Sequence, residues 1–189
     1  SSSSSHDLRE VVVLFFDIRN FTNFSENKEP VEVVNFLNTL FEELVEVVGE
    51  NDGFVNKFLG DGFMAVFGAP LDDPYAAEHA VQASTELLAR LEVLIQQKKI
   101  PPTQVSLGLH MGMALTGTVG TEQRKEYTVI GDAVNTAARV EALNRSYDST
   151  LLVTQAVVDA APEACAKATC LGTAQVKGKE KEVTVYQLA

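Results

Sequence analysis

Apolar residues follow two kinds of pattern along this chain: short continuous runs, and longer stretches with helical periodicity. Residues 11–16 (Val-Val-Val-Leu-Phe-Phe) are all apolar and predict a fully buried strand. Two runs over 54–58 and 63–67 are rich in aromatic and β-branched residues, and Leu59-Gly60-Asp61-Gly62 joins them. These runs predict a hairpin with Asp61 at its tip. Alternation over 105–115 predicts another strand, which a polar, charged loop follows over 117–126.

Three stretches have the spacing of helices that turn one face toward a core. The first begins at Pro30, a residue favoured in a first helical turn, and its apolar residues recur at i, i+3, i+4 and i+7. The second begins at Asp73-Pro74 and continues to Leu94, and the third covers 133–143. The remaining predicted elements are short strands at 127–130, at 151–153, near Leu171 and at 183–188, and a short helix capped by Thr154.

Strands and helices mix here without strict β–α alternation, and a hairpin lies near the centre of the pattern. We therefore predict an α+β fold in which one antiparallel-rich sheet carries helices on one face. No repeat or linker divides residues 9–189, so we predict one domain there and a disordered lead over 1–8. The lead starts with five serines and no Met, which suggests that the domain belongs to a longer chain with an upstream regulatory domain.

Composition narrows the classes of function. The chain has 189 residues and a net charge of −11, which argues against non-specific binding to nucleic acid or to anionic membranes. No apolar stretch approaches the ~20 residues of a membrane span, and nothing resembles a signal peptide. Cys165 and Cys170 are too few for a disulfide framework, so we expect reduced thiols in a cytoplasmic protein. His110 lies in a buried-looking strand, and we interpret it as a core residue.

The most informative residues are two aspartates in apolar, strand-like surroundings. Asp17 ends the first buried run, and Asp61 lies at the tip of the predicted hairpin. A carboxylate at the mouth of an apolar strand is costly unless it is paired or binds a metal. Either residue alone could simply cap a turn or a helix. Together they suggest a carboxylate pair that holds divalent cations, and oxygen ligands favour Mg²⁺ or Mn²⁺.

Four segments, in order, resemble the motifs of a class III nucleotidyl cyclase catalytic domain over nearly the whole chain. The family's first metal motif is matched by Phe16-Asp17-Ile18-Arg19-Asn20-Phe21-Thr22, which resembles it closely in sequence. The family's second metal motif is matched in the same way by Lys57-Phe58-Leu59-Gly60-Asp61. The segment 127–139 (Tyr-Thr-Val-Ile-Gly-Asp-Ala-Val-Asn-Thr-Ala-Ala-Arg) is similar to the family's base and transition-state segment. Val176-Lys177-Gly178-Lys179 is similar to the family's phosphate-binding lysine segment. The resemblance implies a ferredoxin-like or palm-type sheet with helices packed on it.

This resemblance implies a two-metal site for intramolecular phosphoryl transfer. Asp17, Asp61 and the backbone carbonyl of Ile18 would hold two divalent ions, Mg²⁺ or Mn²⁺. The backbone around Phe21 and Thr22 would meet the terminal phosphates.

The same resemblance assigns residues to the ribose and the phosphates. Asn135 would orient the ribose, and Arg139 would stabilise charge on the α-phosphate. Lys177 would bind the β- or γ-phosphate, with Lys179 as the weaker candidate, and Arg124 is a further phosphate candidate.

Two residues bear on the choice of base. Lys57 can donate to N1 of adenine, and the Thr128 hydroxyl can accept from the N6 amino group. Guanine reverses this pattern, so Lys57 points to ATP. Thr128 resembles the class IIIb subgroup, whose members include bicarbonate-responsive soluble cyclases, and regulation by bicarbonate or CO₂ is therefore a further expectation. A β-branched residue chosen only for its strand is the competing interpretation of Thr128.

Such cyclases work as head-to-tail dimers with their sites at the interface. The chain carries both the metal residues and the base and transition-state residues, so the resemblance implies a symmetric homodimer that converts ATP to cyclic AMP. The alternatives are a guanylyl or relaxed cyclase, and a catalytically silent module that senses a nucleotide or an anion.

Overall fold

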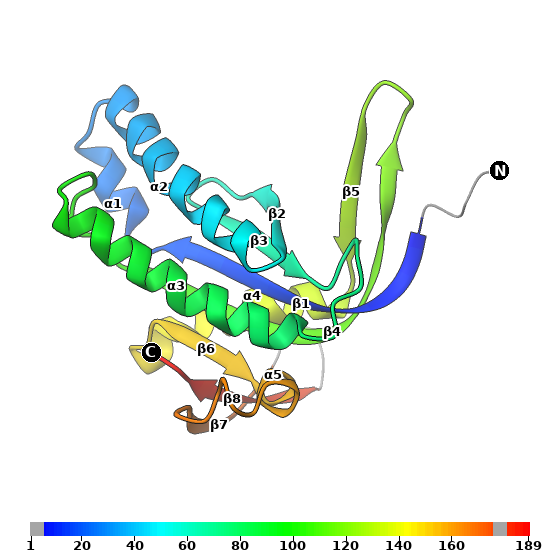
Figure 1. Cartoon of the computed structure of the whole chain (residues 1–189). Helices are drawn as coiled ribbons and strands as arrows, with labels where there is room; N and C mark the ends of the chain where they lie inside the picture. The colour runs from blue at the N-terminus through cyan, green and yellow to red at the C-terminus, as the bar shows by residue number, and fades with distance from the viewer. Residues whose placement is uncertain (1–5, 176–180) are drawn as a thin grey trace.

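A computed structural model of the chain describes residues 6–175 and 181–189, and they form one eight-stranded sheet with helices against it (Figure 1). The strand order is β2-β3-β1-β4-β6-β8-β7, and β5 pairs with β4 outside this path. All pairings are antiparallel except that of β4 with β6. The strands are β1 (His6–Ile18), β2 (Gly53–Phe58), β3 (Gly62–Phe67), β4 (Val105–Gly120), β5 (Lys125–Ile130), β6 (Leu151–Thr154), β7 (Thr169–Gln175) and β8 (Glu182–Gln187). The helices are α1 (Phe21–Glu26), α2 (Pro30–Glu50), α3 (Ala76–Gln96), α4 (Asp132–Tyr147) and α5 (Gln155–Ala160). The predicted α+β class and antiparallel-rich sheet are confirmed.

Helices cover both faces of the sheet, so the prediction that they lie on one face is wrong. Val12 and Leu14 of β1 belong to the core cluster that α2 and α3 complete. Their neighbours Val11 and Val13 belong to the opposite cluster, which includes Ala137 of α4. In Figure 1, α2 and α3 lie in front of β1 and α4 lies behind it. The cause is the continuous apolar run of β1, because alternate side chains of a strand point to opposite faces and both sets are buried here.

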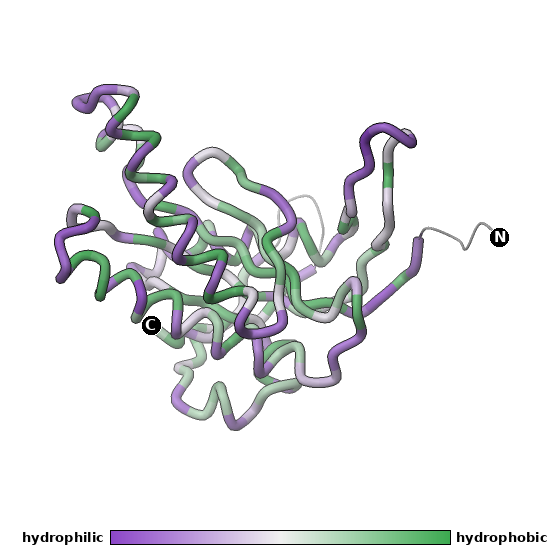
Figure 2. Tube along the Cα trace, turned by 45° about the horizontal axis from the view of Figure 1, so that its top comes forward, coloured by the Kyte–Doolittle hydropathy of each residue, from purple (hydrophilic) through white to green (hydrophobic). Residues whose placement is uncertain are grey.

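The predicted polar loop over 117–126 is instead the end of a long hairpin. β4 continues to Gly120 and β5 starts at Lys125, with Val119 opposite Glu126. Gly120 has φ +135°, and a Cβ on it would lie 2.1 Å from the Arg124 carbonyl oxygen, so the turn needs glycine. The hairpin projects from the body of the sheet, and its tip is hydrophilic in Figure 2. The loop prediction failed because neither face of this arm is buried, so no apolar alternation is required there.

The first strand begins earlier than the sequence pattern indicates. His6, Asp7 and Leu8 pair with Gly117, Thr116 and Leu115 of β4. The lead predicted over 1–8 is therefore too long, because backbone pairing with the projecting arm extends β1 without any burial of side chains.

Two further expectations concern membranes and thiols. No helix in the described ranges is long and apolar enough to cross a membrane. Cys165 is buried and Cys170 is exposed, and both are free thiols, as predicted.

Candidate active site

The structure brings Asp17 and Asp61 together at one end of β1. Asp17 pairs with Gly62 of β3, and Asp61 directly precedes that glycine. The Ile18 N–H donates to the Asp61 carbonyl oxygen at 3.2 Å, which fixes the hairpin tip against the end of β1. A Cβ on Gly62 would lie 2.1 Å from the Phe16 carbonyl oxygen, so only glycine permits this approach. The predicted pairing of the two carboxylates thus follows from strand register.

The electrostatics of this pair suit a divalent cation. The pKa of Asp17 is raised to about 6, chiefly by burial, then by the charge of Asp61 and a side-chain hydrogen bond with it. The charge of Arg145 and a hydrogen bond from the Ile18 N–H lower the pKa of Asp17 and so offset part of this rise. The charged form of Asp17 is therefore favoured by a compensating positive charge at this site. The oxygen-rich pair therefore fits hard ions such as Mg²⁺ or Mn²⁺.

Two residues of α4, Glu141 and Arg145, also reach this end of the sheet, and the sequence interpretation missed both. A Cβ on Gly108 of β4 would lie 2.3 Å from the Glu141 backbone nitrogen, so α4 packs directly on β4 here. The pKa of Glu141 is raised to about 7, first by burial and then by the charge of Asp17. The Arg145 Nη2 lies 3.9 Å from the Asp17 Oδ2. Their i, i+4 spacing on a helix was the available signal, although it does not reveal the sheet partner.

A cavity of about 350 Å³ opens beside the carboxylate pair. Its lining comes from the end of β1, the start of α1, the hairpin tip and α4: Ile18, Asn20, Phe21, Thr22, Asn23, Asp61 and Arg145. Phe21 and Thr22 are thus beside Asp61, where terminal phosphates were expected. Asn20 has φ +56°, and this left-handed residue turns the chain from β1 directly into α1.

Lys57 and Thr128 lie on segments that contact each other. The side-chain Nδ2 of Asn56 donates to the Tyr127 carbonyl oxygen at 2.8 Å, which joins β2 to β5 one residue before each candidate. The Thr128 hydroxyl donates to the Gly117 carbonyl oxygen at 3.1 Å. Lys57 is exposed and Thr128 is partly buried.

Thr128 and the metal pair are far apart along the sheet, whereas Lys57 is opposite Met64, which pairs with Phe15 only two residues from Asp17. Thr128 pairs with Gly117, which is opposite His6 at the start of β1, whereas Asp17 is near the end of that strand.

Asn135 and Arg139 lie one turn apart on α4, and both are exposed. Within the described part of the chain, neither side chain forms a hydrogen bond or an ion pair. At 3.6 residues per turn, they face about 120° around the helix from Glu141 and Arg145. One helix therefore presents two separate polar faces.

Of the remaining phosphate candidates, Arg124 is not at this site within one chain. Arg124 is at the tip of the projecting hairpin, where its side chain is 85% exposed and lies 3.4 Å from Glu126 Oε1. Lys177 and Lys179 lie outside the described residues.

His110 is partly buried, with Nδ1 2.8 Å from the Thr154 hydroxyl oxygen, and burial lowers its pKa to about 4.

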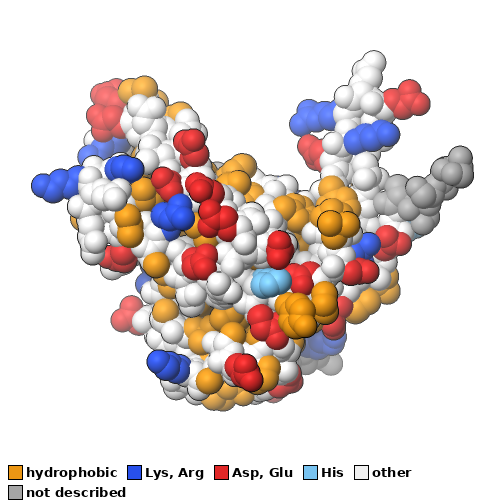
Figure 3. All heavy atoms as spheres, viewed as in Figure 1, with side chains coloured by type: hydrophobic (Ala, Val, Ile, Leu, Met, Phe, Trp, Pro, Cys, Tyr) orange, Lys and Arg blue, Asp and Glu red, His pale blue; other side chains and the backbone are white. Residues whose placement is uncertain are grey.

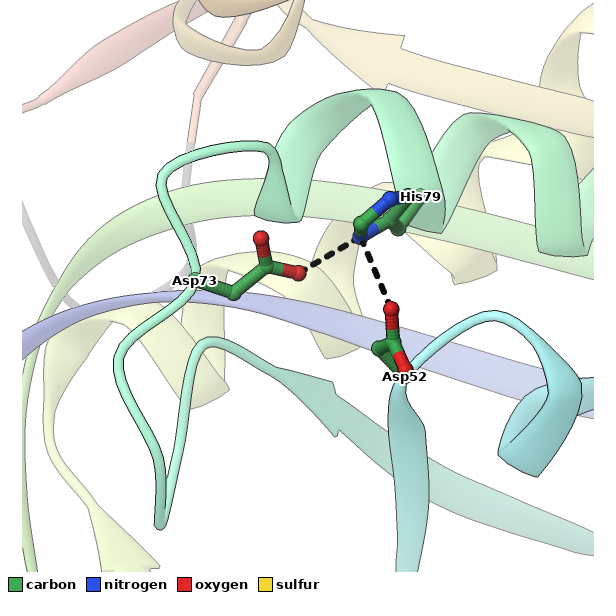
Figure 4. Close-up of side chains that lie close together, drawn as sticks. All are labelled: Asp52, Asp73 and His79. Atoms are coloured by element: carbon green, nitrogen blue, oxygen red, sulfur yellow. Dashed lines mark hydrogen bonds and ion pairs between the residues drawn. The ribbon is translucent and has the colours of Figure 1, made fainter.

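A second group of metal-competent side chains, Asp52, Asp73 and His79, lies away from the carboxylate pair, where Gly53 is aligned through Phe67 with Val12 in the middle of β1 (Figure 4). His79 Nδ1 is 2.6 Å from Asp73 Oδ2 and 3.7 Å from Asp52 Oδ2. The other Asp73 carboxyl oxygen accepts the Tyr75 backbone N–H at 2.9 Å. These contacts tie the turn after α2 to the start of α3. Acidic side chains are also scattered over the face that α2 and α3 form (Figure 3).

Comparisons with known proteins agree with this fold. Residues 3–189 match the family described as the adenylate and guanylate cyclase catalytic domain, and the chain belongs to this family. Adenylate cyclase 1 of Rhizobium meliloti is 37% identical over 183 residues, which are 95% of this chain and 27% of that protein. Adenylate cyclase of Anabaena cylindrica is 36% identical over 186 residues, 95% of this chain and 37% of that protein. The chain thus spans well under half the length of these relatives.

Solved structures include neighbours that are named for either base. The guanylyl cyclase Cya2 superposes with a TM-score of 0.85 at 30% identity, covering 97% of this chain and 93% of that one. The adenylyl cyclase CyaB from P. aeruginosa superposes with a TM-score of 0.84 at 27% identity, covering 96% of this chain and 94% of that one. Both likenesses extend over essentially the whole domain, so the fold alone does not select the base.

Proposed function

We propose that this domain is an adenylyl cyclase that converts ATP to 3′,5′-cyclic AMP and pyrophosphate. The observation that carries the proposal is the pair of Asp17 and Asp61, which strand register places side by side at the end of β1. The adenylate cyclases of Rhizobium meliloti and Anabaena cylindrica support the choice of reaction.

The reaction would be in-line attack of the ribose 3′-hydroxyl on the α-phosphate, with pyrophosphate as the leaving group. Two divalent cations held by Asp17, Asp61 and the Ile18 carbonyl would neutralise phosphate charge and make the 3′-hydroxyl more acidic. The chain's own residues supply position and further charge. Arg139 would stabilise the charge on the α-phosphate, and Asn135 would orient the ribose.

The base contacts favour adenine. Because the Thr128 hydroxyl gives its proton to the Gly117 carbonyl, its oxygen is left as an acceptor, which suits the adenine N6 amino group. The Lys57 ammonium can only donate, which suits N1 of adenine and opposes the N1–H of guanine. Thr128 is also the basis for a class IIIb assignment and for regulation by bicarbonate.

The separation of Thr128 from Asp17 along β1, and the distinct face of α4 that carries Asn135 and Arg139, support a head-to-tail homodimer. Asp17 and Asp61 would act with Lys57, Thr128, Asn135 and Arg139 of a second copy, giving two equivalent sites. Phosphate contacts from Lys177, and from Arg124 on the projecting hairpin, would also come from the second copy. An upstream regulatory domain in the whole protein would then act on how the two copies meet.

The test is cyclic nucleotide production from ATP and from GTP, each with Mg²⁺ and with Mn²⁺, beside an Asp61→Ala control of confirmed folding. We expect cyclic AMP that is lost in the control. Cyclic GMP as the main product would overturn the base assignment and leave the reaction class intact. If folded dimer made neither product, the reaction assignment would be wrong, and a silent nucleotide- or anion-sensing module would replace it.

A guanylyl or relaxed-specificity cyclase is the second candidate. The likeness to the guanylyl cyclase Cya2 over 97% of this chain favours it. A threonine hydroxyl can also rotate to donate to guanine O6, which an ionised carboxylate could not do.

A further inference from the structure

Arg145 has a fixed backbone and a mobile, exposed head group. The adjacent Asn144 is buried, and its Nδ2 donates to the Leu107 carbonyl oxygen at 2.9 Å. Together with the close packing of Glu141 on Gly108, this contact fixes the end of α4 against β4. The Arg145 side chain, in contrast, is 71% exposed.

The contact of Arg145 with Asp17 is too loose to account for the residue by itself. The separation of 3.9 Å from Nη2 to Oδ2 is longer than a hydrogen bond, and exposed pairs of this kind contribute little to stability. Among the described residues, it is the single ion pair that Arg145 forms. The guanidinium therefore neutralises part of the carboxylate charge and can leave Asp17 at little cost.

The surroundings of Arg145 point to a phosphate ligand. It lines the cavity of about 350 Å³ with Asn20, Thr22 and Asp61, and among the residues that the structure describes it is the one basic residue of that lining. A guanidinium presents its N–H donors in a planar fork that matches two phosphate oxygens.

We propose that Arg145 is a phosphate-binding residue of its own chain's metal site, which offsets the charge of Asp17 before the metals bind and then binds the terminal phosphates. This inference rests on the proposed function, because it takes Asp17 and Asp61 as the metal ligands. Removing the charge of Arg145 should therefore have opposite effects on the binding of metal ions and of phosphate. Loss of the positive charge strengthens metal binding, since cations compete for the same carboxylate, and weakens phosphate binding.

The experiment measures two affinities of Arg145→Gln that do not depend on turnover. Mn²⁺ binding without nucleotide is followed by electron paramagnetic resonance at low ionic strength, where we expect it to tighten by up to about tenfold. Pyrophosphate binding at saturating Mg²⁺ is followed by calorimetry, where we expect a loss of about tenfold or more. Arg145→Lys should keep the wild-type Mn²⁺ affinity and bind pyrophosphate more weakly, because it lacks the planar fork.

The matched control is Lys167→Gln, which removes one positive charge from an exposed position between α5 and β7. If Arg145→Gln matches this control in both affinities, or weakens both ligands alike, the proposal for Arg145 is wrong. The Asp61→Ala variant separates this outcome from failure of the proposed function. Mn²⁺ binding that survives Asp61→Ala would refute the metal site itself, whereas its loss there beside an unaffected Arg145→Gln would refute only the role of Arg145.

Discussion

Replacing Glu141 by Gln should stabilise the metal-free domain at high pH. The carboxyl group of Glu141 is largely buried on β4 beside Asp17, and its folded-state pKa is about 7 against an ordinary value of 4.5. Its ionisation therefore opposes folding: the stability it contributes is present in full below pH 4.5 and is lost as pH rises through about 7. The shift corresponds to about 3 kcal/mol at 1.36 kcal/mol per pH unit, and salt reduces it. Glutamine has nearly the same shape and cannot ionise.

The assay is urea unfolding of both proteins at pH 5 and pH 8.5, with EDTA and at one protein concentration, because assembly shifts apparent stability. We expect nearly equal unfolding free energies at pH 5 and a more stable variant at pH 8.5. Glu163→Gln, at an exposed position, serves as the control and should show no such pH dependence. If the advantage of Glu141→Gln were the same at both pH values, the assignment of a raised pKa to a buried Glu141 would be refuted.

Three further predictions concern the proposed reaction. Mixing Asp17→Ala protein with Arg139→Ala protein should restore part of the cyclase activity, since one mixed dimer site is intact; a mixture that stays inactive although both variants dimerise would contradict the shared site. Lys57→Glu combined with Thr128→Gly should gain GTP turnover and lose at least tenfold in ATP turnover, measured as cyclic GMP and cyclic AMP, and no gain would contradict the base assignment. Bicarbonate at fixed pH should raise cyclic AMP output, and a flat dose response would remove the regulatory inference drawn from Thr128.

The sequence predicts the features that depend on local order in the chain. Asp17 and Asp61 could be paired in advance because each adjoins an apolar run that predicts a buried strand. The unbroken apolar run of β1 already implied that both faces of this strand are buried. The predicted placement of the helices on one face did not take this into account. The hairpin arm was missed because an element exposed on both faces needs no periodic apolar pattern.

Glu141 and Arg145 could not be predicted in the same way. Their approach to Asp17 depends on α4 crossing the back of the sheet and on a glycine at position 108 that lets the helix backbone touch the strand. Asp17 is more than 100 positions away from both residues in the sequence, and nothing in the helix itself identifies the strand beneath it. A Glu and an Arg four residues apart are an ordinary surface pair until that strand is known.

The two polar faces of α4 have a consequence for how the two active sites of a dimer of this domain would be coupled. Asn135 and Arg139 would serve the reaction centre shared with the second copy's Asp17, while Glu141 and Arg145 border the chain's own carboxylates. The end of the helix that carries both sets is fixed to β4. In the proposed dimer, a shift of α4 that adjusts Arg139 at one centre would therefore also move Arg145 in the lining of the other, and a change in the angle between the copies would act on both centres.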